Sequence, residues 1–140
     1  MALLKDGKYS INFKSTVEHL EEVEAITSKI AHEVGFDESS SDDLSIVITE
    51  LFNNAIHHGN KNDLNKNVKI DYLIKADHLI ISVQDQGNGF KPDQLKNPLE
   101  PENLLAESGR GIYLVKMLMD DTQFDISDKG CKITIKKKLR

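Results

Sequence analysis

The sequence predicts a single soluble domain of the α+β class. Stretches in which apolar and polar side chains alternate, the pattern of half-buried strands, lie before and after segments in which apolar residues recur every three or four positions, the pattern of amphipathic helices. The length of 140 residues suits one domain with one core. We therefore expect one domain over residues 1–140, built from five strands and three helices.

Composition narrows the possible functions. Hydrophobic residues make up 39% of the chain, and no apolar run approaches the roughly 20 residues that cross a bilayer. Residues 1–8 hold too short an apolar stretch for a signal peptide, so we expect a cytoplasmic protein without a membrane segment. The net charge of -5 argues against direct nucleic-acid binding, and we interpret the basic run at 136–140 as a solvated strand end. The single cysteine, Cys131, excludes an internal disulfide.

The first part of the chain predicts a strand followed by a helix. Residues 8–14 alternate with the period of a half-buried strand, which we place at the edge of the sheet. Apolar residues over 17–34 then recur at helical spacing. Gly35 follows as a plausible helix stop.

A second helix is expected to begin near Ser40 or Ser41, whose hydroxyl can cap it. The aspartates at 42–43 would then occupy its first turn, where the helix dipole favours negative charge. On this helix Glu50 and Asn54 lie one turn apart and roughly 40° apart around the axis. The two side chains should project together at the rim of the core.

Two further strands are expected at 68–75 and 78–85, joined by a short turn. The alternation of the second strand, continued to its end, puts Asp85 on the buried side of the sheet. A buried carboxylate costs free energy unless it is paired, so its presence there needs a functional or structural reason.

The remainder of the chain predicts a lid, a helix and a hairpin. All three prolines fall within a stretch without sustained periodicity, which indicates a long lid loop over about 91–110. A third helix is expected at 112–119, opened by the glycines just before it. The chain then closes with a hairpin that turns at 128–130.

The pair Glu50 and Asn54 is the first of three motifs that carry chemistry. A carboxylate there can take a proton from a water or hydroxyl, and a carboxamide one turn away can complete the ligand shell of Mg²⁺. Taken alone the pair is weak evidence, because a Glu and an Asn four residues apart are common on exposed helix edges.

The other two motifs are glycine-rich. In the segment Asp85 to Phe90, glycines allow the backbone to approach a flat ring closely, and the carboxylate can accept a hydrogen bond from an adenine amine. The alternative is an ordinary turn. In the segment Ser108 to Gly111, unpaired backbone N–H groups at a helix start form an anion site, although a flexible hinge has the same pattern.

Together the three motifs resemble the Asn box and the two glycine boxes of the GHKL (histidine kinase-like) ATPase superfamily. They occur in the family order: Glu50-x-x-x-Asn54-Ala55, then Asp85-x-Gly87-x-Gly89, then Gly109-x-Gly111. The resemblance covers the chain from about residue 42 onward. It implies a two-layer α/β sandwich of the Bergerat type, in which a mixed, mostly antiparallel sheet carries helices on one face.

The resemblance also implies roles for single residues, with ATP and Mg²⁺ as the ligands. Glu50 would be the general base, Asn54 a ligand of Mg²⁺ and a contact of ATP, and Asp85 the residue that recognises adenine. The other residues that it implies for ATP binding are His58, Gly87, Gly89, Phe90, Gly109, Arg110, Gly111, Ile112 and Cys131. Many relatives carry Thr or Ser where this chain has Cys131, and a thiol is the weaker hydrogen-bonding group.

Within the superfamily, the short chain and the residues after Gly109 resemble the anti-sigma-factor serine/threonine-protein kinases. That family implies transfer of the ATP γ-phosphoryl group to a serine of an anti-anti-sigma (STAS-type) partner, sequestration of a sigma factor, and a homodimer. One alternative is a detached catalytic domain of a two-component histidine kinase, although the residues after His32 lack the phosphoacceptor pattern. The other alternative is a non-catalytic module that binds nucleotide or a partner. The presence of Glu50, a candidate base, argues against it.

Overall fold

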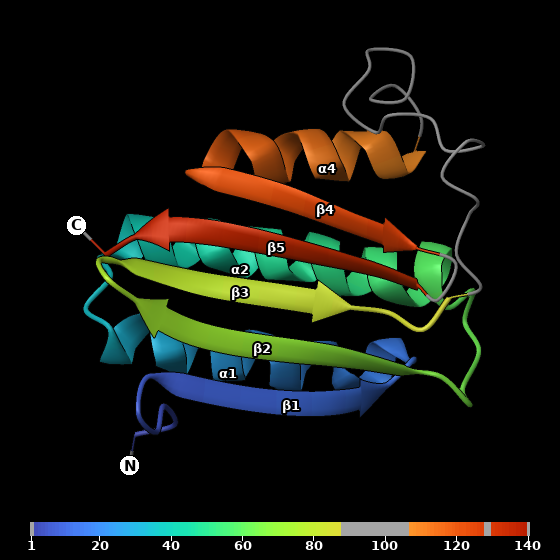
Figure 1. Cartoon of the computed structure of the whole chain (residues 1–140), viewed down its shortest axis with the longest axis horizontal. Helices are drawn as coiled ribbons and strands as arrows, with labels where there is room; N and C mark the ends of the chain where they lie inside the picture. Colours follow the sequence, from blue (N-terminus) through green and yellow to red (C-terminus); the bar gives the residue numbers. More distant parts are fainter. Residues whose placement is uncertain (1, 88–106, 128–129, 140) are drawn as a thin grey trace.

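The computed structural model describes residues 2–87, 107–127 and 130–139, with the backbone alone at 107–110. In this part of the chain one layer is a five-stranded sheet and the other contains three α-helices, all packed on the same face of the sheet (Figure 1). The elements are β1 (Lys8–Lys14), η1 (Val17–His19), α1 (Leu20–Glu33), α2 (Glu38–Asn54), η2 (Ala55–Gly59), β2 (Asn67–Lys75), β3 (His78–Gln84), α4 (Glu107–Leu118), β4 (Asp121–Ser127) and β5 (Gly130–Lys138).

The strand order is β1-β2-β3-β5-β4, and each neighbouring pair is antiparallel. The expectation of a mixed sheet is therefore wrong for the described strands. Strands β2 and β3 follow each other in the chain and pair antiparallel, and the same holds for β4 and β5. Because β5 also runs antiparallel to β3, no parallel pair is left among the described strands. The expected edge position of β1 is confirmed.

The register of the strands puts their apolar side chains in rows on the helix side of the sheet. Tyr72 lies opposite Tyr9 on one side and Ile81 on the other, and Ile81 lies opposite Ile135. Tyr72, Ile81 and Ile135 are each at most 1% exposed. Tyr72 also shares a hydrogen bond of 2.6 Å between its hydroxyl and Thr27 Oγ1 of α1. The sheet and the helix layer thus enclose one core.

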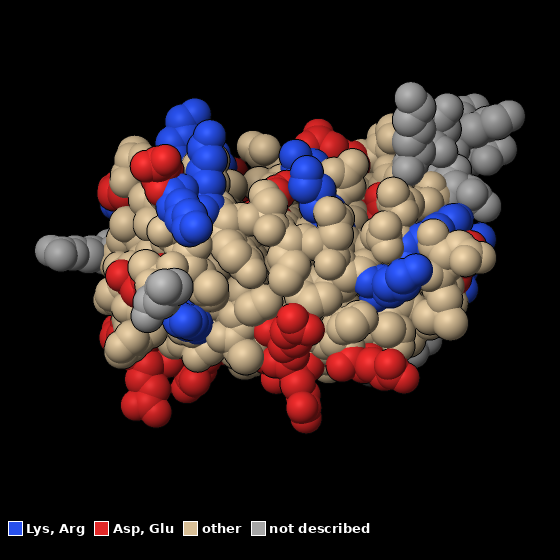
Figure 2. All heavy atoms as spheres, turned by 90° about the horizontal axis from the view of Figure 1, so that it is seen from below, with Lys and Arg blue, Asp and Glu red and all other residues tan. Residues whose placement is uncertain are grey.

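The opposite face of the sheet carries polar and basic side chains, because successive side chains of a strand point to opposite faces. The lysines of this face are Lys8, Lys14, Lys69, Lys75, Lys132, Lys136 and Lys138. Acidic residues occupy the outer surface of the helices, as in the first turn of α1 with Glu21 and Glu22. In Figure 2, which looks along the sheet from the β1 edge, the acidic side chains project on the helix side and basic ones gather on the sheet side.

Helix α2 begins earlier than its serines suggested. Its N-cap is Asp37, whose carboxylate accepts a hydrogen bond of 2.7 Å from the backbone N–H of Ser40. The prediction of a cap at Ser40 or Ser41 is therefore wrong, because an extended residue with an acceptor side chain already stands at position 37. As a consequence the aspartates at 42–43 lie in the second turn.

Helix α4 also begins earlier than expected, at Glu107. Gly109 and Gly111 therefore lie inside the helix, whereas the sequence suggested a loop in front of it. Each glycine lowers helix stability by about 1 kcal/mol relative to alanine. The packing of Ile112 and Val115, which are 4% and 0% exposed, stabilises the helix. No helix in the described ranges is long and apolar enough to cross a membrane.

Candidate functional site

Asp85 is the centre of the candidate site. It follows directly after β3 and is only 6% exposed, as the alternation of that strand predicted. Its Oδ1 accepts hydrogen bonds from the backbone N–H groups of Gly87 and Cys131, both at 3.0 Å. Its own N–H donates to the carbonyl oxygen of Cys131, also at 3.0 Å. The carboxylate is therefore fixed between the end of β3 and the start of β5.

The environment of Asp85 makes it a strong hydrogen-bond acceptor. Burial raises the pKa of this carboxyl, while the two backbone hydrogen bonds and the positive charge of Lys66 act in the opposite direction. A partly desolvated carboxylate gains more from a hydrogen-bond donor than an exposed one does. A ligand that offers an N–H group here would make a charge-assisted bond.

Three glycines bring the backbone against this carboxylate. A Cβ on Gly59 would lie 2.0 Å from Asp85 Oδ2, and one on Gly130 would lie 2.4 Å from the Asp85 carbonyl oxygen. A Cβ on Gly87 would lie 2.2 Å from the carbonyl oxygen of Gly59. Since real Cβ atoms do not approach this closely, each position requires glycine.

Beside Asp85 lies a cavity of about 120 Å³ between the end of α2, the turn after it, and strands β3 and β5. It brings together four residues that the sequence proposed, namely Asn54, His58, Asp85 and Cys131. Its remaining lining residues are Leu51, Ala55, Gly59, Val83 and Ile133. Apolar walls with a few convergent polar groups are typical of small-molecule sites.

The turn η2 places His58 and Gly59 at this cavity. It is a π-helical turn, in which the N–H of Asn60 donates to the carbonyl oxygen of Ala55 at 2.8 Å, five residues back. Such turns are rare and occur frequently at functional sites. His57 points elsewhere and shares a hydrogen bond of 2.7 Å between its Nδ1 and Asn62 Oδ1.

The first and third motifs meet where α2 packs against α4. Glu50 is half-buried, and a Cβ on Gly111 of α4 would lie 2.2 Å from Glu50 Oε2. The glycine of α4 therefore leaves room for the carboxylate. Ile112 belongs to the core, so its side chain faces away from this surface. Gly89, Phe90 and the side chain of Arg110 lie outside the described residues.

Cys131 contributes mainly through its backbone, which exchanges the two hydrogen bonds with Asp85 described above. Its thiol is partly buried and lines the cavity. Burial raises the pKa of this thiol to about 12, with smaller contributions from the negative charges of Asp85 and Asp125. The thiol is therefore neutral at physiological pH.

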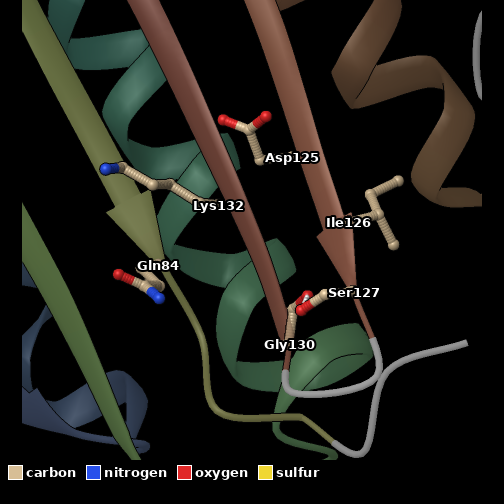
Figure 3. A pocket seen from close by; sticks show the side chains of 6 residues that line it. All are labelled: Gln84, Asp125, Ile126, Ser127, Gly130 and Lys132. Atoms are coloured by element: carbon tan, nitrogen blue, oxygen red, sulfur yellow. Dashed lines mark hydrogen bonds between the residues drawn. The ribbon is translucent and has the colours of Figure 1, made fainter.

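A second hollow, of about 240 Å³, lies at the same end of the sheet but is open on the other face (Figure 3). Figure 3 shows Gln84, Lys132 and Asp125 on three adjacent strands. Gln84 and Asp125 are exposed to solvent, whereas the carboxylate of Asp85 is buried and fixed by backbone groups. We therefore place the candidate site at the Asp85 cavity.

The described residues contain no group of three or more His, Cys, Asp or Glu side chains that could hold a metal ion. A site that supplies one carboxamide, Asn54, suits Mg²⁺ that arrives with phosphate groups, since this ion usually keeps waters and takes few protein ligands. A tetrahedral zinc site is not formed by these residues.

Sequence reasoning missed three residues at this site. Gly59 and Gly130 were assigned no contact with Asp85, and Asn60 was not considered. A glycine at a helix end or in a hairpin has a sufficient local explanation, so only the fold reveals its contact with a distant carboxylate.

Comparison with known proteins identifies related sequences. Residues 13–137 match the family model of the histidine kinase-like ATPase domain. The chain is 31% identical over 104 residues to the serine-protein kinase RsbW of Oceanobacillus iheyensis, covering 70% of this chain and 66% of that protein. It is 35% identical over 118 residues to the serine-protein kinase RsbW of Bacillus licheniformis, covering 80% and 73% respectively. The alignments thus span about two thirds to three quarters of these two relatives.

Solved structures share the fold. The RsbU and RsbW domains of a Mycobacterium tuberculosis protein superpose with a TM-score of 0.70 at 19% identity, over 94% of this chain and 32% of that chain. The histidine kinase domain of a blue-light activated histidine kinase from Erythrobacter litoralis superposes with a TM-score of 0.61 at 16% identity, over 84% and 61%.

Proposed function

The chain belongs to the histidine kinase-like ATPase domain family, and from this premise we propose that it is an ATP-dependent serine-protein kinase that acts as an anti-sigma factor. In this proposal ATP occupies the Asp85 cavity. Its γ-phosphoryl group is transferred to a serine of an anti-anti-sigma partner. The names of the sequence relatives support serine as the acceptor.

The observation that carries the proposal is the fixed, buried carboxylate of Asp85 at the end of an apolar cavity. Two backbone N–H groups hold its Oδ1, and the missing side chain of Gly59 leaves the room that its Oδ2 occupies. The exocyclic amine of adenine is a donor of the right kind for such a group. The apolar walls around it suit a flat ring.

The residues of α2 supply the proposed chemistry. Asn54 would hold Mg²⁺, and the ion when bound would offset the charge of the phosphates. Glu50 would accept the proton of the attacking serine hydroxyl, as a positioned carboxylate does in general base catalysis. Gly111 leaves the space that this carboxylate needs.

Further details of the proposal concern assembly. We propose that the protein acts in the cytoplasm as a homodimer, with an anti-anti-sigma protein and a sigma factor as alternative partners. The lid expected at about 91–110 falls on residues 91–106, which lie outside the described part of the chain, and on 107–110, which belong to α4. We propose that Arg110 and the α4 glycines contact the phosphates. Gly89, Phe90 and His58 complete the proposed ATP contacts.

Labelled ATP tests the proposal directly. The protein is incubated with γ-labelled ATP, Mg²⁺ and candidate partner proteins, and the acid and base stability of the phosphorylated residue is determined. We expect an acid-stable phosphoserine on the partner. Phosphohistidine would favour the catalytic domain of a histidine kinase. Binding of ATP without any transfer would favour a non-catalytic module.

The variant Glu50→Ala tests the proposed base. Transfer should fall roughly 10² to 10⁴-fold while ATP affinity stays nearly unchanged, because the carboxylate acts on the acceptor hydroxyl. Glu38→Ala, at the opposite end of α2, is the matched control and should retain full activity. Unimpaired transfer in Glu50→Ala would remove Glu50 from the mechanism.

A further inference from the structure

The buried side chain of Asn60 has no role in the chemistry proposed above. It is 0% exposed and follows directly after the π-helical turn η2. Its Nδ2 donates hydrogen bonds to Ser15 Oγ at 2.5 Å and to the carbonyl oxygen of Asn67 at 3.0 Å. Its Oδ1 accepts a hydrogen bond of 2.7 Å from the backbone N–H of Gln86. One side chain thus joins three separate segments of the chain.

The bond to Gln86 is the important one, because Gln86 follows Asp85. Strand β3 ends at Gln84, and the N–H of Asp85 still donates to Cys131 of β5, whereas the N–H of Gln86 is held by Asn60. The N–H of Gln86 belongs to the Asp85–Gln86 peptide group, and Asn60 fixes the position of that N–H. The side chain of Gln86 adds a second tether, since its Oε1 accepts a hydrogen bond of 2.7 Å from the N–H of Asn67.

The same turn therefore contacts Asp85 twice. Gly59 lies against the carboxylate, where an added Cβ would be 2.0 Å from Oδ2. Asn60, the next residue, holds the peptide group that follows Asp85. The five-residue hydrogen bond from Asn60 N–H to Ala55 sets the path that brings both residues to this position.

The position of the Asp85 carboxylate depends on this peptide group. One of the two donors to its Oδ1 is the N–H of Gly87, which is one residue beyond the tethered peptide. If the tether were lost, the Gly87 N–H could move and the carboxylate would lose one of its two fixed donors. The other donor, the N–H of Cys131, belongs to a strand and would remain.

We propose that Asn60 is a positioning residue for base recognition, which holds the Asp85–Gln86 peptide so that the Asp85 carboxylate stays directed at the amine of adenine. The inference rests on the proposed function, because it assigns Asn60 to the same nucleotide site. A buried asparagine with a merely structural role would change stability without changing which base is preferred.

The test compares two nucleotides that differ at the base. Calorimetry measures the dissociation constants of ATP and of inosine triphosphate, which carries a carbonyl oxygen in place of the exocyclic amine. In the wild type we expect ATP to bind roughly tenfold to a hundredfold more tightly than inosine triphosphate. A charge-assisted hydrogen bond changes the dissociation constant by about this factor. In Asn60→Ala we expect this ratio to fall to within about threefold of unity, because a carboxylate held by one backbone donor instead of two loses its fixed direction and with it most of that bond.

Thr27→Val is the matched control. Thr27, in α1, is 1% exposed and is not among the residues that line the cavity. Valine there loses one buried hydrogen bond, the one to Tyr72, whereas Asn60→Ala loses three. Thr27→Val should lose stability and keep the ratio of the wild type. A reduced ratio in both variants would mean that general destabilisation is the cause and would overturn the inference.

The outcomes separate the inference from the proposed function. A wild type that does not prefer ATP over inosine triphosphate contradicts the adenine assignment of Asp85, and with it the role of Asn60. A wild type that prefers ATP, with Asn60→Ala retaining the same ratio, overturns the role of Asn60 alone. If Asn60→Ala does not fold, Gln86→Pro removes the N–H that Asn60 holds, and Gln86→Ala, which keeps that N–H and loses only the side-chain tether to Asn67, is its control. Equal ratios in these two variants would overturn the inference as well.

Discussion

At the scale of single residues, Asp85 shows a conflict between stability and binding. Burial raises the pKa of its carboxyl above the ordinary value of 3.8. For a group whose pKa is raised by folding, the favourable contribution to stability is complete below the ordinary pKa and is lost as the pH rises through the raised value. Folding therefore disfavours the ionised form of Asp85 relative to the unfolded chain, and a hydrogen-bond donor of a ligand would offset this cost.

The variant Asp85→Asn should separate the two effects. The amide oxygen can still accept from the N–H groups of Gly87 and Cys131, so the backbone should keep its path. ATP affinity should fall roughly tenfold to a hundredfold, because the charge-assisted bond to the base is lost. Unchanged affinity in a calorimetric titration would remove Asp85 from the site.

The stability of the same variant should depend on pH. Urea unfolding at pH 4 and pH 7 should show that Asp85→Asn gains stability relative to the wild type as the pH rises, because the variant has no carboxylate to ionise in the folded state. The carboxyls of Glu33 and Asp37, whose pKa values are lowered by hydrogen bonds from backbone N–H groups, are common to both proteins and cancel in the difference. A difference that stays constant with pH would contradict the raised pKa.

The thiol of Cys131 should react slowly in the native protein. Only the thiolate is nucleophilic, and a shift of the pKa from 9.0 to about 12 lowers its fraction at pH 8 about 10³-fold. Alkylation by iodoacetamide, followed by mass spectrometry, should therefore be slower by up to this factor in the folded state than in urea. Cys131 is the only cysteine of the chain, so the measured rate reports it alone. Equal rates in the two states would contradict the burial of the thiol.

At the scale of secondary-structure elements, the sequence predicted what a local period can reveal. Strands β1, β2 and β3 and helix α1 were found within a few residues of their bounds, because alternation and helical spacing depend on one segment only. The start of α4 was missed, since two glycines outweighed the packing of Ile112 and Val115. The antiparallel pairs β2–β3 and β4–β5 agree with the strand pair and the hairpin that the sequence predicted. The strand order β1-β2-β3-β5-β4 and the π-helical turn leave no local pattern, so they could not be predicted.

The candidate site likewise contains residues that a local motif predicted and residues that only the fold reveals. Glu50, Asn54 and Asp85 were proposed because each belongs to a recognisable short motif. Asn60 and Gly59 contact the segment after β3 across about 26 residues of chain, a separation that no motif spans. A buried asparagine whose three partners lie in three segments becomes visible only when the segments are assembled.

The contact between α2 and α4 leads to a prediction for Gly111→Ala. Alanine favours a helix by about 1 kcal/mol over glycine, so the fold should be retained. The new Cβ would lie 2.2 Å from Glu50 Oε2, the flexible end of that side chain, which should therefore move. Phosphoryl transfer should fall roughly tenfold to a hundredfold, since small displacements of a catalytic group have effects of this size.

The control for this variant is Lys116→Ala, an exposed position of α4 where the side chain contacts solvent. Both variants should show the circular dichroism of the wild type. Normal transfer by Gly111→Ala would show that the carboxylate can leave its observed position without loss, and that α4 does not constrain the proposed base.

At the scale of the whole molecule, a ligand in the Asp85 cavity would join elements that are far apart in sequence. The cavity is lined by α2, η2, β3 and β5, so bound nucleotide opposes the separation of the sheet from the helix layer. Binding to the folded state alone stabilises it by about 2.7 kcal/mol at a ligand concentration of 100 times the dissociation constant.

Thermal unfolding should therefore respond to ATP. For a domain of this size, that stabilisation corresponds to a rise in the melting temperature of roughly 5 to 10 °C. Asp85→Asn at the same ATP concentration should show a clearly smaller rise. An equal rise in both proteins would place the nucleotide somewhere other than beside Asp85.

The position of β5 has a consequence for how the protein folds during its synthesis on the ribosome. β5 is synthesised after the other four described strands, yet it lies between β3 and β4 and supplies the N–H of Cys131 that holds Asp85. Until residue 138 has left the exit tunnel, β3 has an unpaired side and the Asp85 carboxylate lacks one of its two backbone donors. The candidate site is therefore complete only after translation has passed β5, and a shortened translation product that ends before this strand would have a sheet with an open, aggregation-prone edge.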